Sequence, residues 1–333
     1  MKAFAVVGQN GPIVEVDFPE KQPTGHDLLI EVKAVSVNPV DTKVRNVATG
    51  LTNNARVLGY DASGVVKAVG EQVSLFKVGD EVFYAGDITR PGTNMVNHLV
   101  DERIAGRKPK NTSFNEAAAY PLTSITAYEA LFEKLNFSFT HPIQNKDKTL
   151  LIINGAGGVG SIAIQLAKLA GLTVVATASR PETIEWVKKM GADYVINHRQ
   201  TFAEEFDPLP FKEVDAILCL NDTKGHWQNM ADVIKPFGMI CSIVECGNPM
   251  DIDVFKSKSV SFAWEFMFTR AKYQTADMIE QHHLLNNVSA LIEEGKVKST
   301  LTKTLSGFNA QNIDQAHQLV QAGNMIGKVV IGV

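Results

Sequence analysis

Three glycines with a fixed spacing stand where a predicted strand gives way to a predicted helix. Gly155, Gly157 and Gly160 form a G-x-G-x-x-G pattern in LIINGAGGVG, residues 151–160. The first glycine permits a tight turn, the second lets the backbone approach a pyrophosphate, and the third allows close packing of the helix. The pattern predicts a dinucleotide site, with a turn that serves only packing as the alternative. The predicted cofactor residues of this loop are Gly155, Gly157, Gly158, Val159 and Gly160.

The end of the next predicted strand indicates which dinucleotide would bind. Sites for NAD place Asp or Glu about 20 residues after the glycine pattern, where the carboxylate binds the ribose 2′-OH. This chain carries Ser179 and Arg180 there. Because a guanidinium pairs with a 2′-phosphate and a carboxylate does not, the two residues favour NADPH. The alternative is that Arg180 only faces solvent.

These residues lie in a portion of the chain where short apolar runs and helical patterns alternate. Strands are predicted at 149–154, 173–178, 194–197, 216–220, 239–244 and 260–268. Helices are predicted at 158–169, between Pro181 and Gly191, and at 224–234. Strands that alternate with helices predict an α/β fold with a doubly wound parallel sheet.

The portions on either side of the sheet have a different pattern. Residues 2–109 contain short strand-like runs separated by Gly, Pro and Asn, typical of a β-rich domain, and an Ala-rich helix is expected at 116–131. The C-terminal portion predicts helices at 276–294 and 310–321 and a strand at 328–333. We expect it to return to the first domain, giving domains of 1–122, 123–268 and 269–333.

The composition of the chain argues against nucleic acid and membranes as partners. The 333 residues are 45% hydrophobic with a net charge of −4 and no long basic run, so nucleic acid is not an expected partner. The chain has no apolar stretch of about 20 residues and no signal-like start, so we expect no membrane partner and a cytoplasmic location. Its three cysteines, Cys219, Cys241 and Cys246, are expected to be reduced.

The order of several further segments is similar to that of the medium-chain dehydrogenase/reductase superfamily, most of all to its quinone oxidoreductase branch. The matching segments are SVNPVDTKVR (36–45), GYDASGVV (59–66), FKVGDEVF (76–83), PLTSITAYEAL (121–131), the glycine loop, MGADYVIN (190–197) and the closing GKVVI. The resemblance implies a Rossmann sheet inserted into a β-rich GroES-like domain, with the nicotinamide in a cleft.

The zinc-dependent members of this superfamily carry Cys, a Gly-His-Glu motif and a further Cys or Asp as metal ligands. The resemblance places Asn38, Tyr60 and Leu122 at those positions, and Val40 where the zinc branch has the Ser or Thr of its proton relay. Zinc sites use about four N, S or O ligands. We therefore expect no metal site. Without zinc to polarise a simple carbonyl, a quinone or an α,β-unsaturated carbonyl is the expected acceptor, because conjugation spreads the developing charge.

The resemblance also supplies candidate residues around the cofactor and substrate. Asn38 and Tyr60 are the candidate catalytic residues, since an amide or a phenol could donate a hydrogen bond to a developing oxyanion. Thr126 matches a position near the nicotinamide, and His198 one that flanks the adenine. The alternatives are that Asn38 only fixes its loop, that Tyr60 packs inside the barrel, and that Thr126 and His198 serve packing or face solvent.

Three questions stay open at this level. The chain could be an enone or aldehyde reductase with one metabolic substrate, or an NADPH-binding redox sensor with little turnover. The aromatic run SVSFAWEFMF, 259–268, predicts a homodimer through an edge strand, as in relatives, or else lines the substrate cleft. The physiological substrate depends on the loops 45–54 and 86–94, whose shape the sequence does not specify.

Overall fold

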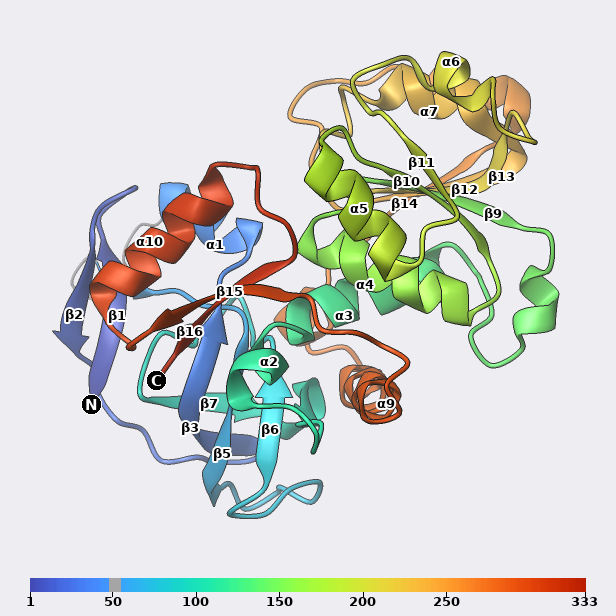
Figure 1. Ribbon diagram of the computed structural model, residues 1–333. Helices are drawn as coiled ribbons and strands as arrows, with labels where there is room; N and C mark the ends of the chain where they lie inside the picture. The colour runs from blue at the N-terminus through green and yellow to red at the C-terminus, as the bar shows by residue number, and fades with distance from the viewer. Residues whose placement is uncertain (48–54) are drawn as a thin grey trace. The chain divides into compact units, whose positions relative to one another are not determined.

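The computed structural model describes residues 1–47 and 55–333, so most of the predicted substrate loop 45–54 lies outside the described residues. By its internal contacts the chain divides into two compact units (Figure 1). Unit 1 comprises residues 1–125 together with 267–333, and unit 2 comprises residues 126–266. Unit 2 is therefore continuous in sequence, whereas unit 1 is assembled from both ends of the chain.

Unit 2 is built on one six-stranded parallel sheet with the order β11-β10-β9-β12-β13-β14. Its strands are β9 (Thr149–Ile153), β10 (Thr173–Thr177), β11 (Tyr194–Ile196), β12 (Val214–Cys219), β13 (Ile234–Ser242) and β14 (Ser261–Trp264). Its helices are α4 (Gly158–Leu169), α5 (Pro181–Met190), α6 (Phe202–Phe206) and α7 (Trp227–Val233). The strand order reverses beside β9, and this confirms the predicted doubly wound sheet.

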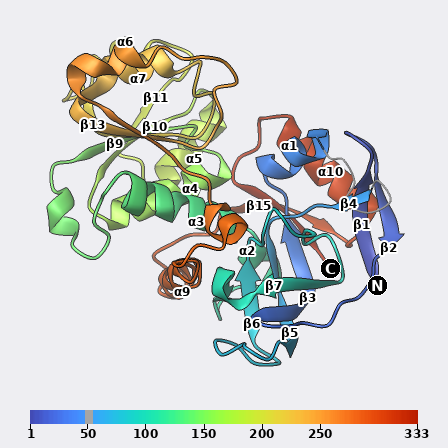
Figure 2. The same cartoon turned by 180° about the vertical axis from the view of Figure 1, so that it is seen from behind.

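Helices cover both faces of this sheet. In Figures 1 and 2, α4 and α5 lie on one side of the strands and α6 and α7 on the other. All five residues of β9 (TLLII) are buried, as expected for a central strand covered on both faces. The helix α5 begins at Pro181 and ends before Gly191, whose φ of 112° is left-handed, so the predicted start and stop signals are confirmed.

Some predicted elements of unit 2 differ in extent. The predicted strand 260–268 stops at Trp264, because the residues after it enter a turn and a short helix. The strand β13 begins at Ile234, five residues before its predicted start, and passes through Phe237 with a φ of 62°. The first five residues of β13, Ile-Lys-Pro-Phe-Gly, include a proline and a glycine, which are typical of turns, so the apolar pattern placed the start of this strand too late.

Unit 1 contains two sheets. A seven-stranded sheet has the order β15-β16-β3-β5-β6-β8, with β7 pairing β3, and a three-stranded sheet has the order β2-β1-β4. The strands are β1 (Lys2–Val7), β2 (Ile13–Asp17), β3 (Asp27–Ser36), β4 (Ala55–Val57), β5 (Ala62–Val69), β6 (Glu81–Tyr84), β7 (Asn97–Asp101), β8 (Ala105–Arg107), β15 (Leu301–Ser306) and β16 (Lys328–Gly332). The last of these strands, β16, pairs antiparallel with β3, so residues 328–332 complete the sheet of the N-terminal part.

One predicted helix and one strand outside the parallel sheet differ from the prediction. The expected helix 116–131 is interrupted just before Pro121 and forms α2 (Phe114–Ala118), α3 (Pro121–Tyr128), which crosses from unit 1 into unit 2, and a π-helical turn of unit 2, Glu129–Lys134. Proline lacks the N–H that a continuous helix needs, which accounts for the interruption. The remaining α-helices are α1 (Pro39–Val47), α8 (Thr269–Tyr273), α9 (Glu280–Glu293) and α10 (Ala310–Gln321). The strand β15 was not predicted, because its residues are half-buried or exposed and lack an apolar pattern.

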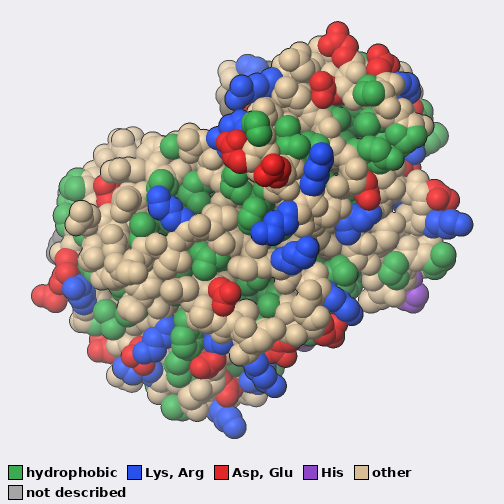
Figure 3. All heavy atoms as spheres, in the orientation of Figure 1, with side chains coloured by type: hydrophobic (Ala, Val, Ile, Leu, Met, Phe, Trp, Pro, Cys, Tyr) green, Lys and Arg blue, Asp and Glu red, His purple; other side chains and the backbone are tan. Residues whose placement is uncertain are grey.

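The surface carries charges of both signs. On the face shown in Figure 3, lysine and arginine side chains lie among aspartates and glutamates. Within residues 1–47 and 55–333, no helix is long and apolar enough to cross a bilayer.

Candidate active site

The glycine loop has the geometry of a phosphate-binding turn. A Cβ on Gly160 would lie 2.6 Å from the carbonyl oxygens of Asn154 and Gly155, so only glycine fits between the loop and α4. A Cβ on Gly157 would meet only Asn154, at 3.3 Å. The backbone is therefore much more crowded at Gly160 than at Gly157, where only the Asn154 side chain and carbonyl lie close.

The first turn of α4 offers its backbone N–H groups to a ligand. Gly157 is the N-cap residue and has no side chain to satisfy these groups, and the described structure shows no side-chain cap there. Unpaired N–H groups and the helix dipole favour a phosphate at this end. The residues present fit a dinucleotide, with Gly157, Gly158 and Val159 beside its pyrophosphate.

Arg180 follows the carboxyl end of β10, where the sequence places the determinant of cofactor choice. It is the N-cap residue of α5, and its Nε lies 3.1 Å from Oε1 of Glu182. Both side chains are partly exposed, so this ion pair contributes little and is readily exchanged for another anion. Ser179 precedes it and is half-buried.

A histidine pair lies near Arg180 at the same edge of the sheet. His198 follows β11, and its ring centroid lies 6.4 Å from that of His226, which stacks on Phe202 at 5.4 Å. Both Nδ1 atoms are buried and make no hydrogen bond to any described residue. Burial lowers the pKa of both rings, and His226, Arg199 and Arg180 add to the effect on His198. Sequence reasoning proposed His198 and missed His226, which no motif marks.

Thr126, the other predicted cofactor residue outside the loop, is buried within α3. The two candidate catalytic residues belong to unit 1. Asn38 is buried after β3, and its Nδ2 donates to Oδ2 of Asp61 at 2.7 Å while its Oδ1 accepts from Lys328.

Tyr60 is fully buried, and its ring meets Phe268 edge to face with centroids 5.2 Å apart. Its buried hydroxyl lies beside the guanidinium of Arg56, and burial raises its pKa to about 12. This environment favours packing, the alternative weighed for Tyr60 above, over direct contact with substrate.

Comparisons with known proteins agree with this geometry. Residues 24–124 match the model of the alcohol dehydrogenase GroES-like domain, and residues 190–331 match that of the zinc-binding dehydrogenases. A zinc-type alcohol dehydrogenase-like protein of Staphylococcus aureus (strain COL) is 47% identical over 311 residues, covering 93% of this chain and 92% of its own length. The chain belongs to the medium-chain dehydrogenase/reductase superfamily.

Two further proteins, one a solved structure and one an enzyme named for its substrate, are similar to this chain over most of its length. A crystal structure of a Rhizobium etli CFN 42 protein, named for the zinc-dependent alcohol dehydrogenases, has 50% identity and a TM-score of 0.94, and covers 100% of this chain and 98% of its own. The 2-methylene-furan-3-one reductase of Solanum lycopersicum is 33% identical over 91% of this chain and 71% of its own length.

A zinc ion does not fit the residues at the superfamily's zinc-ligand positions. Asn38 uses its amide in the network above, Tyr60 is buried against Phe268, and Leu122 has no donor side chain. The neighbouring carboxylate of Asp61 is already held by the Lys328 ammonium at 3.0 Å. Among the described residues, no three His, Cys, Asp or Glu side chains come together as a possible metal site.

A buried carboxyl pair at the carboxyl edge of β14 was missed by sequence reasoning. Glu265 and Glu129 are buried and share a hydrogen bond, and Lys134 Nζ lies 3.9 Å from Oε2 of Glu265. Burial and the charge of Glu129 hold the pKa of Glu265 far above its usual range, so this carboxyl carries a proton at neutral pH.

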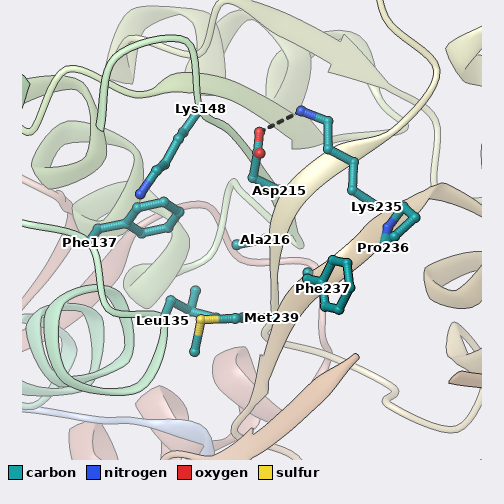
Figure 4. A pocket seen from close by; sticks show the side chains of 10 residues that line it. Leu135, Phe137, Lys148, Asp215, Ala216, Lys235, Pro236, Phe237 and Met239 are labelled. Atoms are coloured by element: carbon teal, nitrogen blue, oxygen red, sulfur yellow. Dashed lines mark hydrogen bonds and ion pairs between the residues drawn. The ribbon is translucent and has the colours of Figure 1, made fainter. Parts of the chain in front are cut away.

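A surface pocket of unit 2 lies at the opposite edge of the same sheet. It is lined by Lys148, before β9, by Asp215 in β12, and by Lys235 and Phe237 in β13 (Figure 4). Lys235 Nζ lies 2.8 Å from Oδ2 of Asp215. Because the glycine loop follows the other end of β9, this pocket is separate from the predicted cofactor residues.

Proposed function

We propose that this chain is an NADPH-dependent reductase of quinones or other α,β-unsaturated carbonyls that works without zinc. The observation that carries the proposal is Arg180, a guanidinium at the end of β10 where an NAD site has an acid. Its neighbours support the same cofactor, because His198 adds an imidazole and Arg199 a second guanidinium near Arg180.

We infer the substrate class from the residues at the superfamily's zinc-ligand positions. NADPH, when bound, supplies a hydride to the β-carbon of an enone or to a quinone ring, and solvent delivers the balancing proton. The chain offers no Lewis acid at Asn38, Tyr60 and Leu122 to activate an unconjugated carbonyl. Its own residues bind and orient: the glycine loop holds the pyrophosphate, Arg180 the 2′-phosphate, and Asn38 has an amide N–H for the substrate oxygen.

The names of two relatives support this class of substrate. The tomato protein is a 2-methylene-furan-3-one reductase, and an Arabidopsis thaliana relative, 31% identical over 91% of this chain, is an NADPH-dependent alkenal/one oxidoreductase. Both names describe reduction of a carbonyl conjugated to an alkene.

The test is a panel of quinones, enones, saturated aldehydes and alcohols, assayed with NADPH and NADH side by side. We expect turnover of conjugated acceptors with NADPH. Arg180→Ala should raise KM for NADPH about 10-fold to 100-fold, since a hydrogen bond between charged groups contributes about 1.5–3 kcal/mol, and should leave KM for NADH unchanged. Lys212→Ala is the control, because it also removes an exposed cation of unit 2 that forms an ion pair, here with Asp207, and it lies outside the predicted cofactor residues.

Equal use of NADH by the unaltered protein would overturn the cofactor choice. Tight NADPH binding without turnover of any acceptor would favour a redox sensor, and turnover of saturated aldehydes alone would overturn the substrate class.

A further inference from the structure

Four polar side chains are buried together in unit 1: Asn38, Asp41, Asp61 and Lys328. The ammonium of Lys328 lies 3.0 Å from Oδ2 of Asp61 and 3.2 Å from the carbonyl oxygen of Val37, and it contacts Oδ1 of Asn38. An ammonium has three hydrogens, and these three acceptors use them all. Lys328 therefore has a fully satisfied buried charge.

The ammonium joins chain segments that are far apart in sequence. Asn38 follows β3, Asp61 precedes β5, and Oδ1 of Asp61 accepts the backbone N–H of Leu122 in α3 at 2.8 Å. These segments hold the metal ligands in zinc-dependent members of the superfamily. In this chain the ammonium of Lys328, from β16, binds the segments of Asn38 and Asp61, and Asp61 in turn binds that of Leu122.

The same contacts fix the amide of Asn38 in one orientation. Its Nδ2 donates to Asp61 at 2.7 Å, and its Oδ1 accepts from Lys328. A flipped amide would set its oxygen against the carboxylate and its N–H groups against the ammonium, and both contacts would be repulsive. One Nδ2 hydrogen is used by Asp61, which leaves the second for another acceptor.

We propose that Lys328 is a positioning residue of the substrate site: it takes the place of a metal ion in joining residues 38, 61 and 122, and it orients the Asn38 amide toward the substrate oxygen. The proposal rests on the proposed function. Contact with an ammonium also draws electron density from the amide nitrogen, which makes its free N–H a stronger donor to a developing oxyanion.

The test compares Lys328→Met with the double variant Lys328→Met, Asp61→Asn, which removes both charges. Lys328→Met leaves the Asp61 carboxylate buried without a counter-charge, so its Tm should fall. The double variant should regain most of that loss, yet its kcat should stay at least tenfold below that of the unaltered protein, with KM for NADPH unchanged. Lys108→Met is the matched control, because Lys108 is also buried in unit 1 and bonds to Pro109 and Thr112 instead.

Hydrogen exchange of the backbone supplies a readout that does not depend on turnover. In both Lys328 variants the amides of residues 36–44 and 118–126 should exchange at least tenfold faster, whereas Lys108→Met should leave them unchanged. A double variant with unaltered kcat, or with unaltered exchange, would overturn the proposal. If the unaltered protein reduces no conjugated acceptor, the proposed function fails. The role of Lys328 in joining residues 38, 61 and 122 is then judged by hydrogen exchange alone, and unaltered exchange in the Lys328 variants would overturn it.

Discussion

Asn154 donates its backbone N–H to Oγ1 of Thr177 at 2.9 Å, across the gap between β9 and β10. Thr177 also accepts the N–H of Gly155 through its carbonyl oxygen, at 3.2 Å. Asn154 has a left-handed φ of 68°, a conformation that asparagine adopts more readily than most residues with a side chain. The buried Thr177 therefore holds the first residues of the glycine loop in place.

Replacing Thr177 by Val should weaken NADPH binding. The change preserves the side-chain shape but leaves the Asn154 N–H without its acceptor, at a cost of about 1 kcal/mol, or about fivefold in Kd. Titration calorimetry with NADPH measures the effect, and Thr177→Ser, which keeps the hydroxyl, should bind as the unaltered protein does. An unchanged Kd in Thr177→Val would show that this bond serves stability alone.

Alanine at Gly160 and at Gly157 should separate folding from binding. At Gly160 the new Cβ would lie 2.6 Å from two backbone oxygens, so we expect a loss of about 2 kcal/mol in the free energy of unfolding. At Gly157 the φ of −71° suits alanine, and stability should change by less than about 0.5 kcal/mol. Gly157→Ala should nevertheless lose NADPH affinity, because the methyl group would stand where we propose that the backbone approaches the pyrophosphate. Urea unfolding and calorimetry on both variants check this, and strong NADPH binding by Gly157→Ala would contradict it.

The positions of the candidate cofactor residues could be predicted from sequence because they follow one another along a repeating strand and helix pattern. Gly155, Gly160 and Arg180 could be placed from spacing alone. The Lys328–Asp61 ion pair and the Glu129–Glu265 pair could not, because each joins positions more than 100 residues apart that carry no shared motif. The strand β15 also escaped prediction, since pairing with β16 rather than an apolar pattern determines it.

Glu265→Gln should change how stability depends on pH. The pKa of Glu265 is raised in the folded state, so the folded protein keeps a proton that the unfolded chain releases above about pH 4.5. Stability therefore falls as pH rises above that value, by up to about 1.4 kcal/mol per pH unit, until the folded carboxyl ionises. The glutamine variant lacks this dependence and should be the more stable protein at pH 8–9.

Urea unfolding between pH 5 and 9 measures this difference. Glu204→Gln, a change at an exposed residue of α6, should follow the unaltered protein at every pH. Parallel curves for Glu265→Gln and the unaltered protein would contradict the shift.

The edge strand β14 should mediate a homodimer, as we propose from its position and side chains. In the described part of the sheet it pairs only with β13, and its Trp264 is 49% exposed. A second copy paired along β14 would cover this edge and bury the indole ring. Light scattering after size-exclusion chromatography should show a dimer for the unaltered protein and a monomer for Trp264→Glu. Ile143→Glu, at a residue 76% exposed elsewhere, should remain a dimer, and a monomeric unaltered protein would refute the assignment.

The bond between Lys328 and Asn38 spans 290 residues and ends on the final strand of the chain. During synthesis on the ribosome, Asp61 is therefore made long before the amine that neutralises it. Residues 126–266 are complete by then. We expect unit 2 to fold before the two outer segments of unit 1 join.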